Sequence, residues 1–155
     1  MIADTLNFLF TEVFHGKAPD ETGTYFVQSN ESLFETLADL TAEQASHKIS
    51  PSVSTIAAHT IHTNYYLWFS LEFMHGRIPH ADWDSSWATQ TVTEEEWQAE
   101  INKLREQTDL FKSLLHSKDF TDRDNLFGAI ANIAHASFHL GAIRQIFLAV
   151  KDQTN

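Results

Sequence analysis

The sequence predicts an all-α protein that folds as a four-helix bundle. Apolar residues recur at helical spacing along most of the 155 residues, and no stretch of useful length alternates apolar and polar residues as a strand would. The five glycines and three prolines gather at a few points, which divide the chain into segments. Four long helical segments joined by loops pack as a bundle, and a chain of this length forms a single domain, residues 1–155.

The first third of the chain contains one long helix and two shorter pieces. The long helix runs from about residue 2 to residue 14 and stops before Gly16. A second piece covers roughly residues 30–40, in which four apolar residues share one helical face: Leu33, Phe34, Leu37 and Leu40. Residues 41–44 then resemble a capping box that opens one short turn.

Two helices and a loop between them come next, before the last helix. A helix is expected to start at Ser50–Ser52 and to run to His75, because the following glycine is a typical helix stop. A loop over residues 77–91 contains two tryptophans and is predicted to pack through its aromatic residues. Residues 92–97 fit both a capping box and a hydrophobic staple, so they start the next helix.

The last helix is capped by Asp122 or Asp124 and continues to about Val150. The connection over about residues 41–51 and the loop over residues 77–92 can each cross an end of the bundle. An up-down-up-down order of the helices therefore does not follow from the pattern alone.

Composition excludes several classes of function. The chain has no cysteine, which excludes thiolate zinc sites, iron–sulfur clusters, disulfides and cysteine nucleophiles, and which fits a cytoplasmic protein. Ten Lys and Arg against 21 Asp and Glu give a net charge of −11, which opposes binding to nucleic acid. No stretch is apolar for long enough to span a bilayer, and the first residues lack the basic region of a signal peptide. We therefore expect a cytoplasmic protein with neither nucleic acid nor membrane as a partner.

Two of the nine histidines point to a metal site. His135 and His139 lie four residues apart in the last helix, so both rings project from one face, together with the apolar Ile143 and Ile146. Burying two neutral imidazoles is costly unless something binds their nitrogen atoms, and a divalent metal ion is the usual answer. The alternative is that these are ordinary core histidines with hydrogen-bond partners.

The third ligand is expected from the helix that ends near residue 75. His62 lies at the centre of an aromatic face, which we take to point into the bundle, and His59 lies about 60° away on its flank. We rank His62 as a ligand, and His59 as a hydrogen-bonding neighbour of a ligand or as an alternative ligand. Three histidines leave a coordination position open, which is typical of a catalytic metal.

The segments around these histidines resemble DinB-like/YfiT-like proteins. Residues 55–62, followed fourteen residues later by Gly76, are similar to the second-helix pattern of that family. Residues 134–141 are similar to its last-helix motif, in which two histidines precede a glycine. Residues 81–87 and 93–97 resemble one subgroup, so that the likeness covers nearly the whole chain.

The resemblance implies an up-down-down-up four-helix bundle, often homodimeric, that holds a divalent metal, commonly zinc or nickel. Carried over residue by residue, the three ligands are His62, His135 and His139. Many relatives have a glutamine directly after the glycine of the last motif. Here Ala142 stands at that place, and the nearest glutamine is Gln145.

The related proteins include thiol-dependent S-transferases and metal-dependent hydrolases, so the resemblance implies a small-molecule substrate such as a low-molecular-weight thiol. The metal would either lower the pKa of a bound water or bind and deprotonate the thiol. No acidic residue of the motifs stands out as a general base, which weakens the hydrolase alternative. A non-catalytic bundle that binds metal or a small ligand remains the alternative, in which a side chain such as His59 fills the fourth position. A haem-binding bundle fits less well, since no attachment motif is present.

Overall fold

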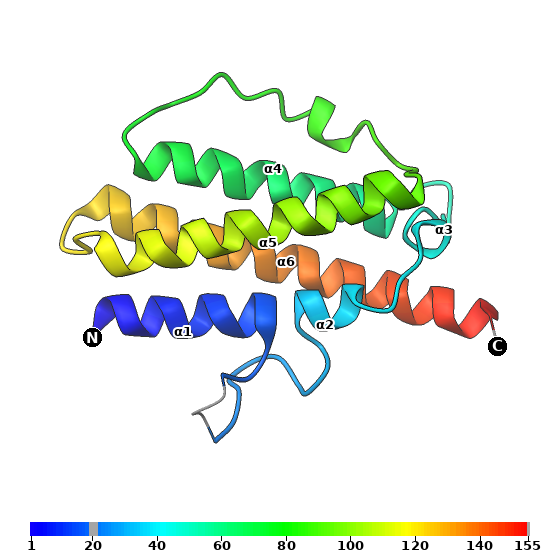
Figure 1. The fold of residues 1–155 in the computed structure, drawn as a ribbon, viewed down its shortest axis with the longest axis horizontal. Helices are drawn as coiled ribbons and strands as arrows, with labels where there is room; N and C mark the ends of the chain where they lie inside the picture. Colours follow the sequence, from blue (N-terminus) through cyan, green and yellow to red (C-terminus); the bar gives the residue numbers. More distant parts are fainter. Residues whose placement is uncertain (19–21, 155) are drawn as a thin grey trace.

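The computed structural model describes residues 1–18 and 22–154, and it confirms the all-α class (Figure 1). Those residues contain no strand. Four long helices form the bundle, and two short helices and one 3₁₀ turn lie in the connections. The long helices are α1 (Ile2–His15), α4 (Ile56–Met74), α5 (Glu94–Ser117) and α6 (Arg123–Thr154); the short elements are α2 (Leu33–Leu37), α3 (Ala42–Ala45) and η1 (Ser85–Trp87).

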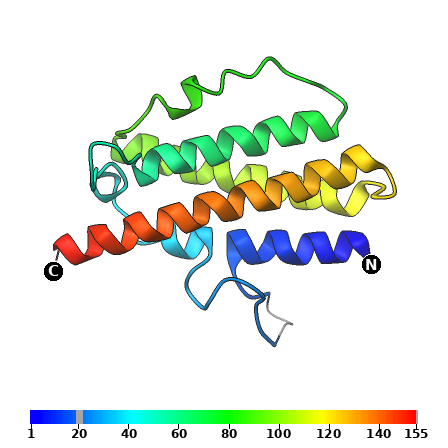
Figure 2. The same cartoon turned by 180° about the vertical axis from the view of Figure 1, so that it is seen from behind.

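The long helices are arranged up-down-down-up, as the family resemblance implied. In Figure 1, α1 and α6 run from left to right, whereas α4 and α5 run from right to left. Two consecutive parallel helices need a connection that returns along their whole length. Residues 75–93 make this connection and pass over the outer side of α4, which both views show (Figures 1 and 2).

The predicted helix starts are confirmed at three places. Thr41 and Thr93 each accept a hydrogen bond at 3.2 Å from the backbone N–H three residues further on, and both take part in capping boxes. The carboxylate of Asp122 accepts bonds from the backbone N–H groups of Asp124 and Asn125 at 3.0 and 2.9 Å. Asp122, of the two candidates, therefore caps α6.

The predicted start of α4 at Ser50–Ser52 is wrong. These residues form a turn in which the Ser50 hydroxyl accepts a bond from the Ser52 backbone N–H at 3.4 Å, so the serines serve a turn and not a cap. The cap is Thr55, whose hydroxyl oxygen accepts from the Ala58 N–H at 3.2 Å. The helix ends as predicted before Gly76, whose φ of 78° is in the left-handed region.

The segment predicted to be helical over residues 30–40 is helical only in α2. Asn30 has a φ of 65°, which a helix does not accommodate. Ser32 and Glu35 form a capping box just after it, so the helix starts three residues later than predicted, at Leu33, and ends at Leu37.

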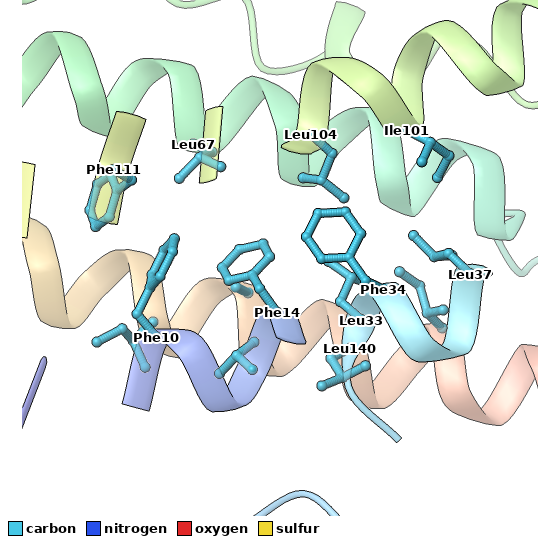
Figure 3. Close-up of a cluster of buried hydrophobic side chains, with 14 of the residues drawn as sticks. Phe10, Phe14, Leu33, Phe34, Leu37, Leu67, Ile101, Leu104, Phe111 and Leu140 are labelled. Carbon is cyan, nitrogen blue, oxygen red and sulfur yellow. The ribbon is translucent and has the colours of Figure 1, made fainter. Parts of the chain in front are cut away.

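The apolar core lies where α1 and α2 face α4, α5 and α6 (Figure 3). Phe10 stacks on Phe111 with ring centroids 5.0 Å apart and packs against Phe14 at 4.5 Å. Leu33 and Leu104 are fully buried beside them. Each such side chain contributes about 1.5–3 kcal/mol when it is buried completely, so this cluster stabilises the bundle independently of any metal.

The core also corrects the expected orientation of α4. Asn64, Leu67 and Leu71, which the helical wheel places away from His62, are buried in the bundle, whereas Tyr66 and Phe69 on the His62 side are half-buried. The reason is that α4 packs against both α5 and α6, and that the returning connection contacts it as well. The face with His62 therefore points to the seam between α4, α6 and the connection, and not to the centre of the bundle.

The expectation that no stretch is apolar for long enough to span a bilayer is wrong for α6. The segment Arg123–Asp152 of α6 is long and apolar enough, by length and composition, to cross a bilayer. Only 39% of the most apolar 18-residue stretch of this segment is buried in the bundle. Core helices pass the same test, and α6 supplies core residues such as Ile143, so the finding is weak evidence for a membrane segment.

Candidate metal centre

Three imidazole nitrogen atoms converge between α4 and α6. The Nε2 atom of His135 lies 3.2 Å from the Nε2 atoms of both His62 and His139. Their ligand atoms all lie within 4.8 Å of one another. Zinc binds imidazole nitrogen at about 2.0–2.1 Å, so two nitrogens of a tetrahedral site stand about 3.3 Å apart. The structure thus brings together the three residues ranked as ligands, at separations that suit a single ion.

Secondary structure sets this geometry. His135 and His139 are one helical turn apart on α6, so their rings lie one above the other, and His62 approaches from the middle of α4. The Tyr66 ring stacks on His135 with centroids 3.6 Å apart, and the Trp87 ring stacks on His62 at 4.1 Å. These two aromatic rings hold the imidazoles in place, because stacked rings cannot turn without losing the contact.

The connection between α4 and α5 contributes a hydroxyl group to the cluster. The Nδ1 atom of His62, which faces away from the other two rings, lies 2.7 Å from the Oγ atom of Ser86. The Ser86 hydroxyl in turn donates a hydrogen bond at 2.6 Å to the backbone carbonyl of Trp83. Ser86 is only 4% exposed, although it lies in a loop.

His59 lies behind His139 and not among the converging nitrogens. Its Nδ1 atom is 2.9 Å from the Nδ1 atom of His139, the ring nitrogen that does not face the cluster. The His59 and Trp87 rings are nearly perpendicular, with their centroids 5.1 Å apart. This is the position of a hydrogen-bonding neighbour of a ligand, one of the two roles expected for His59.

Burial keeps the three rings uncharged. It lowers the pKa of His62 and of His135 to about 4, and that of His139 to about 3, with a smaller contribution from mutual repulsion between the rings. Burial also lowers the pKa of His59. At neutral pH the rings are therefore neutral imidazoles, the form that binds a metal ion.

The donor set is purely imidazole. Within residues 1–18 and 22–154, no aspartate or glutamate joins the group of converging ligand atoms. Neutral nitrogen donors suit borderline metals such as zinc and nickel, whereas calcium and magnesium prefer oxygen donors. Three protein donors also leave room for an exchangeable ligand.

Some functional residues were not foreseen from the sequence. Ser86 and Trp87 complete the surroundings of His62, but they lie in a connection without the periodicity of a long helix. The tryptophans of this segment and the resemblance of residues 81–87 to one subgroup were the only signals. Gln145 is exposed and lines a groove beside Phe26, on a different side of α6 from the cluster. It therefore does not replace the glutamine that many relatives carry next to the last motif.

Comparison with known proteins adds one match. The family model described as the DinB superfamily matches residues 25–143, a span that includes all four of these histidines. No curated protein and no solved structure matches the chain.

Proposed function

This chain belongs to the DinB superfamily, and on that premise we propose that it is a metal-dependent enzyme acting on a small molecule. One observation carries the proposal, namely the convergence of the Nε2 atoms of His62, His135 and His139 without a fourth protein donor in the group among the described residues. A structural zinc site is normally closed by four protein ligands, whereas a catalytic site keeps a position free.

The residues present fit a divalent cation, zinc or nickel in preference to a hard metal. When bound, the cation supplies a Lewis acid that lowers the pKa of a coordinated water or thiol. The three rings need not lose a proton before they bind, because burial keeps them neutral. Their neutrality also leaves the full positive charge of the cation for the exchangeable ligand.

Between the two reaction classes, thiol transfer is the better supported. Hydrolysis benefits from a carboxylate that accepts a proton from water, and no carboxylate joins the histidine group among the described residues. The walls of the site are aromatic: Trp87 and Tyr66 stack on the ligand rings, and Trp83 lies next to them. Burial raises the pKa of the Tyr66 hydroxyl, so that it stays protonated and can donate a hydrogen bond.

The alternative is a bundle that binds metal without catalysis. It is favoured by the burial of His62 and His139, which are 7% and 3% exposed, and by His59 beside the group. In that case a protein side chain would fill the fourth position, and no added ligand would reach the metal.

A single series of measurements separates these functions. The cobalt-substituted protein is titrated with a low-molecular-weight thiol, and the visible spectrum is recorded. A thiolate-to-metal absorption band supports an open site, and turnover of the thiol with an electrophile, compared with ester and amide substrates, then identifies the reaction. An unchanged spectrum together with no turnover would favour the non-catalytic alternative.

A further inference from the structure

We infer that the connection over residues 75–93 belongs to the metal centre. In it, Ser86 determines which ring nitrogen of His62 carries the proton. The inference rests on the proposed metal binding and adds two statements to it. The hydroxyl of Ser86 keeps the Nε2 lone pair of His62 directed at the cluster. Binding of the metal and docking of the connection onto α4 stabilise each other.

The proton position follows from the two hydrogen bonds of Ser86. A serine hydroxyl has one proton, and this proton goes to the backbone carbonyl of Trp83, which can only accept. Ser86 must therefore accept at its other contact, the 2.7 Å contact with Nδ1 of His62. A neutral imidazole carries one proton, so the Nδ1–H form of His62 has a free lone pair on Nε2. That is the nitrogen 3.2 Å from His135.

The connection is held along α4 at three points. The Tyr65 hydroxyl oxygen accepts from the Asp82 backbone N–H at 2.8 Å. At the other end, Thr55 donates through its backbone N–H to the Gln90 side chain at 3.1 Å and through its hydroxyl to the Gln90 backbone carbonyl at 2.7 Å. The contact of Ser86 lies between these two anchors, where the connection meets a ligand ring.

This arrangement couples the connection to the metal. When the connection lifts off α4, His62 loses the acceptor for its Nδ1–H and the stacked Trp87 ring, and its proton is free to move to Nε2, where it blocks metal binding. Loss of an outer hydrogen-bond partner weakens metal binding by about 10–100-fold in comparable sites. Because the coupling is reciprocal, the bound metal must disfavour lifting of the connection by the same factor.

The chain offers a matched control one residue away. Ser85 lies on the same 3₁₀ turn, is exposed, and donates its hydroxyl hydrogen bond to the Asp82 carbonyl without touching a histidine. Ser85→Ala and Ser86→Ala therefore remove the same group from the same turn. Ser86→Thr keeps the hydroxyl and serves as the conservative variant.

The test measures zinc affinity by competition with a chromophoric chelator, and hydrogen exchange of the amides of residues 82–90 with and without zinc. We expect Ser86→Ala to weaken zinc binding by about 10–100-fold, Ser86→Thr to restore most of it, and Ser85→Ala to leave it unchanged. In the wild type, zinc should slow amide exchange in the connection. In the metal-free wild type, the ¹⁵N chemical shifts of His62 should report the Nδ1–H form.

The failures are distinguishable. A wild type that binds no zinc would overturn the proposed function and this inference with it. A wild type that binds zinc, while Ser86→Ala and Ser85→Ala bind it equally well, would overturn the inference alone. Two measurements on the wild type keep the test valid even if the Ser86→Ala variant does not fold: a proton on Nε2 of His62, or exchange in the connection that zinc does not change, would each contradict it.

Discussion

At the scale of single residues, the site depends on which nitrogen of each ring carries a proton and on how fully each ring is buried. His139 is the most buried of the three, and its outer nitrogen is occupied by His59. His135 is half-buried and is held by the Tyr66 ring. The three ligands therefore differ in their supports, although they present the same atom to the cluster.

The first prediction concerns the two histidines at the back of the site. His139→Ala removes a converging nitrogen, whereas His59→Ala removes only the partner of its Nδ1 atom. We expect His139→Ala to weaken zinc binding by more than about 100-fold, and His59→Ala by about 10-fold. Calorimetric titration of both variants measures the difference. Equal losses would mean that His59 is itself a ligand.

The second prediction concerns pH. The ring pKa values are 6.5 in the unfolded chain and about 3–4 in the folded protein, so between these values the unfolded chain binds more protons. The free energy of unfolding of the metal-free protein should therefore be largest above about pH 6.5 and should decrease as the pH falls toward 4. Urea unfolding at several pH values tests this. The His135→Gln variant should show a smaller loss, and identical pH profiles would contradict the assignment.

At the scale of elements, the sequence predicts helix starts with a capping box but does not predict the path of the connections. The capping boxes at Thr41 and Thr93 are local patterns within four residues, and both are present. The start of α4 was misplaced because Ser50 and Ser52 form a turn, and because the true cap, Thr55, is followed three residues later by Ala58 and so has no capping box. Likewise the histidine pair of α6 follows from helical spacing, whereas Ser86 enters the site through a connection whose path only the folded chain defines.

A second long-range contact of this kind joins α1 to the segment that follows it. Glu12 is 2% exposed, and its Oε1 atom accepts hydrogen bonds from the backbone N–H groups of Tyr25, Phe26 and Val27 at 2.7, 2.7 and 3.0 Å. No sequence pattern marked this glutamate. The buried carboxylate holds the segment before α2 against the bundle.

The third prediction tests this contact. Glu12→Gln removes the negative charge that strengthens three hydrogen bonds, so we expect a loss of about 1–3 kcal/mol in the free energy of unfolding. Chemical denaturation measures it. Glu106→Gln on the exposed side of α5 is the control and should change stability little. Equal effects of the two substitutions would show that the negative charge of Glu12 adds nothing to these bonds.

At the scale of the whole molecule, α6 has two apolar sides. One side contributes to the core, and the outer side exposes large apolar residues, of which Phe138 is 72% exposed. The rings of Phe138 and His139 are nearly perpendicular, with their centroids 5.2 Å apart. The four-helix class could be expected from the sequence pattern, and the helix order from the resemblance to DinB-like proteins. The exposure of this face could not, because a wheel of α6 shows apolar residues on both sides and does not say which side is covered.

The fourth prediction places the expected homodimer on this face. A charge there should prevent two copies from pairing, so we expect Phe138→Asp to be a monomer at concentrations where the wild type is a dimer. Light scattering after size-exclusion chromatography measures the mass. Leu110→Asp, at an exposed apolar position on α5, is the control and should leave the mass unchanged. A wild type that is monomeric, or a Phe138→Asp variant that still pairs, would contradict the placement.

The parallel course of α4 and α5 has a consequence for how such proteins can diversify. The helix α4 has 19 residues and is about 28 Å long. The connection over residues 75–93 returns along this length and covers the seam in which the three histidines lie. The connection adds little to the apolar core, so most of its sequence can vary while the bundle stays stable. New substrate preferences can therefore arise through changes in this connection at positions other than Ser86 and Trp87, which contact His62, with the helices and the three ring nitrogens left as they are.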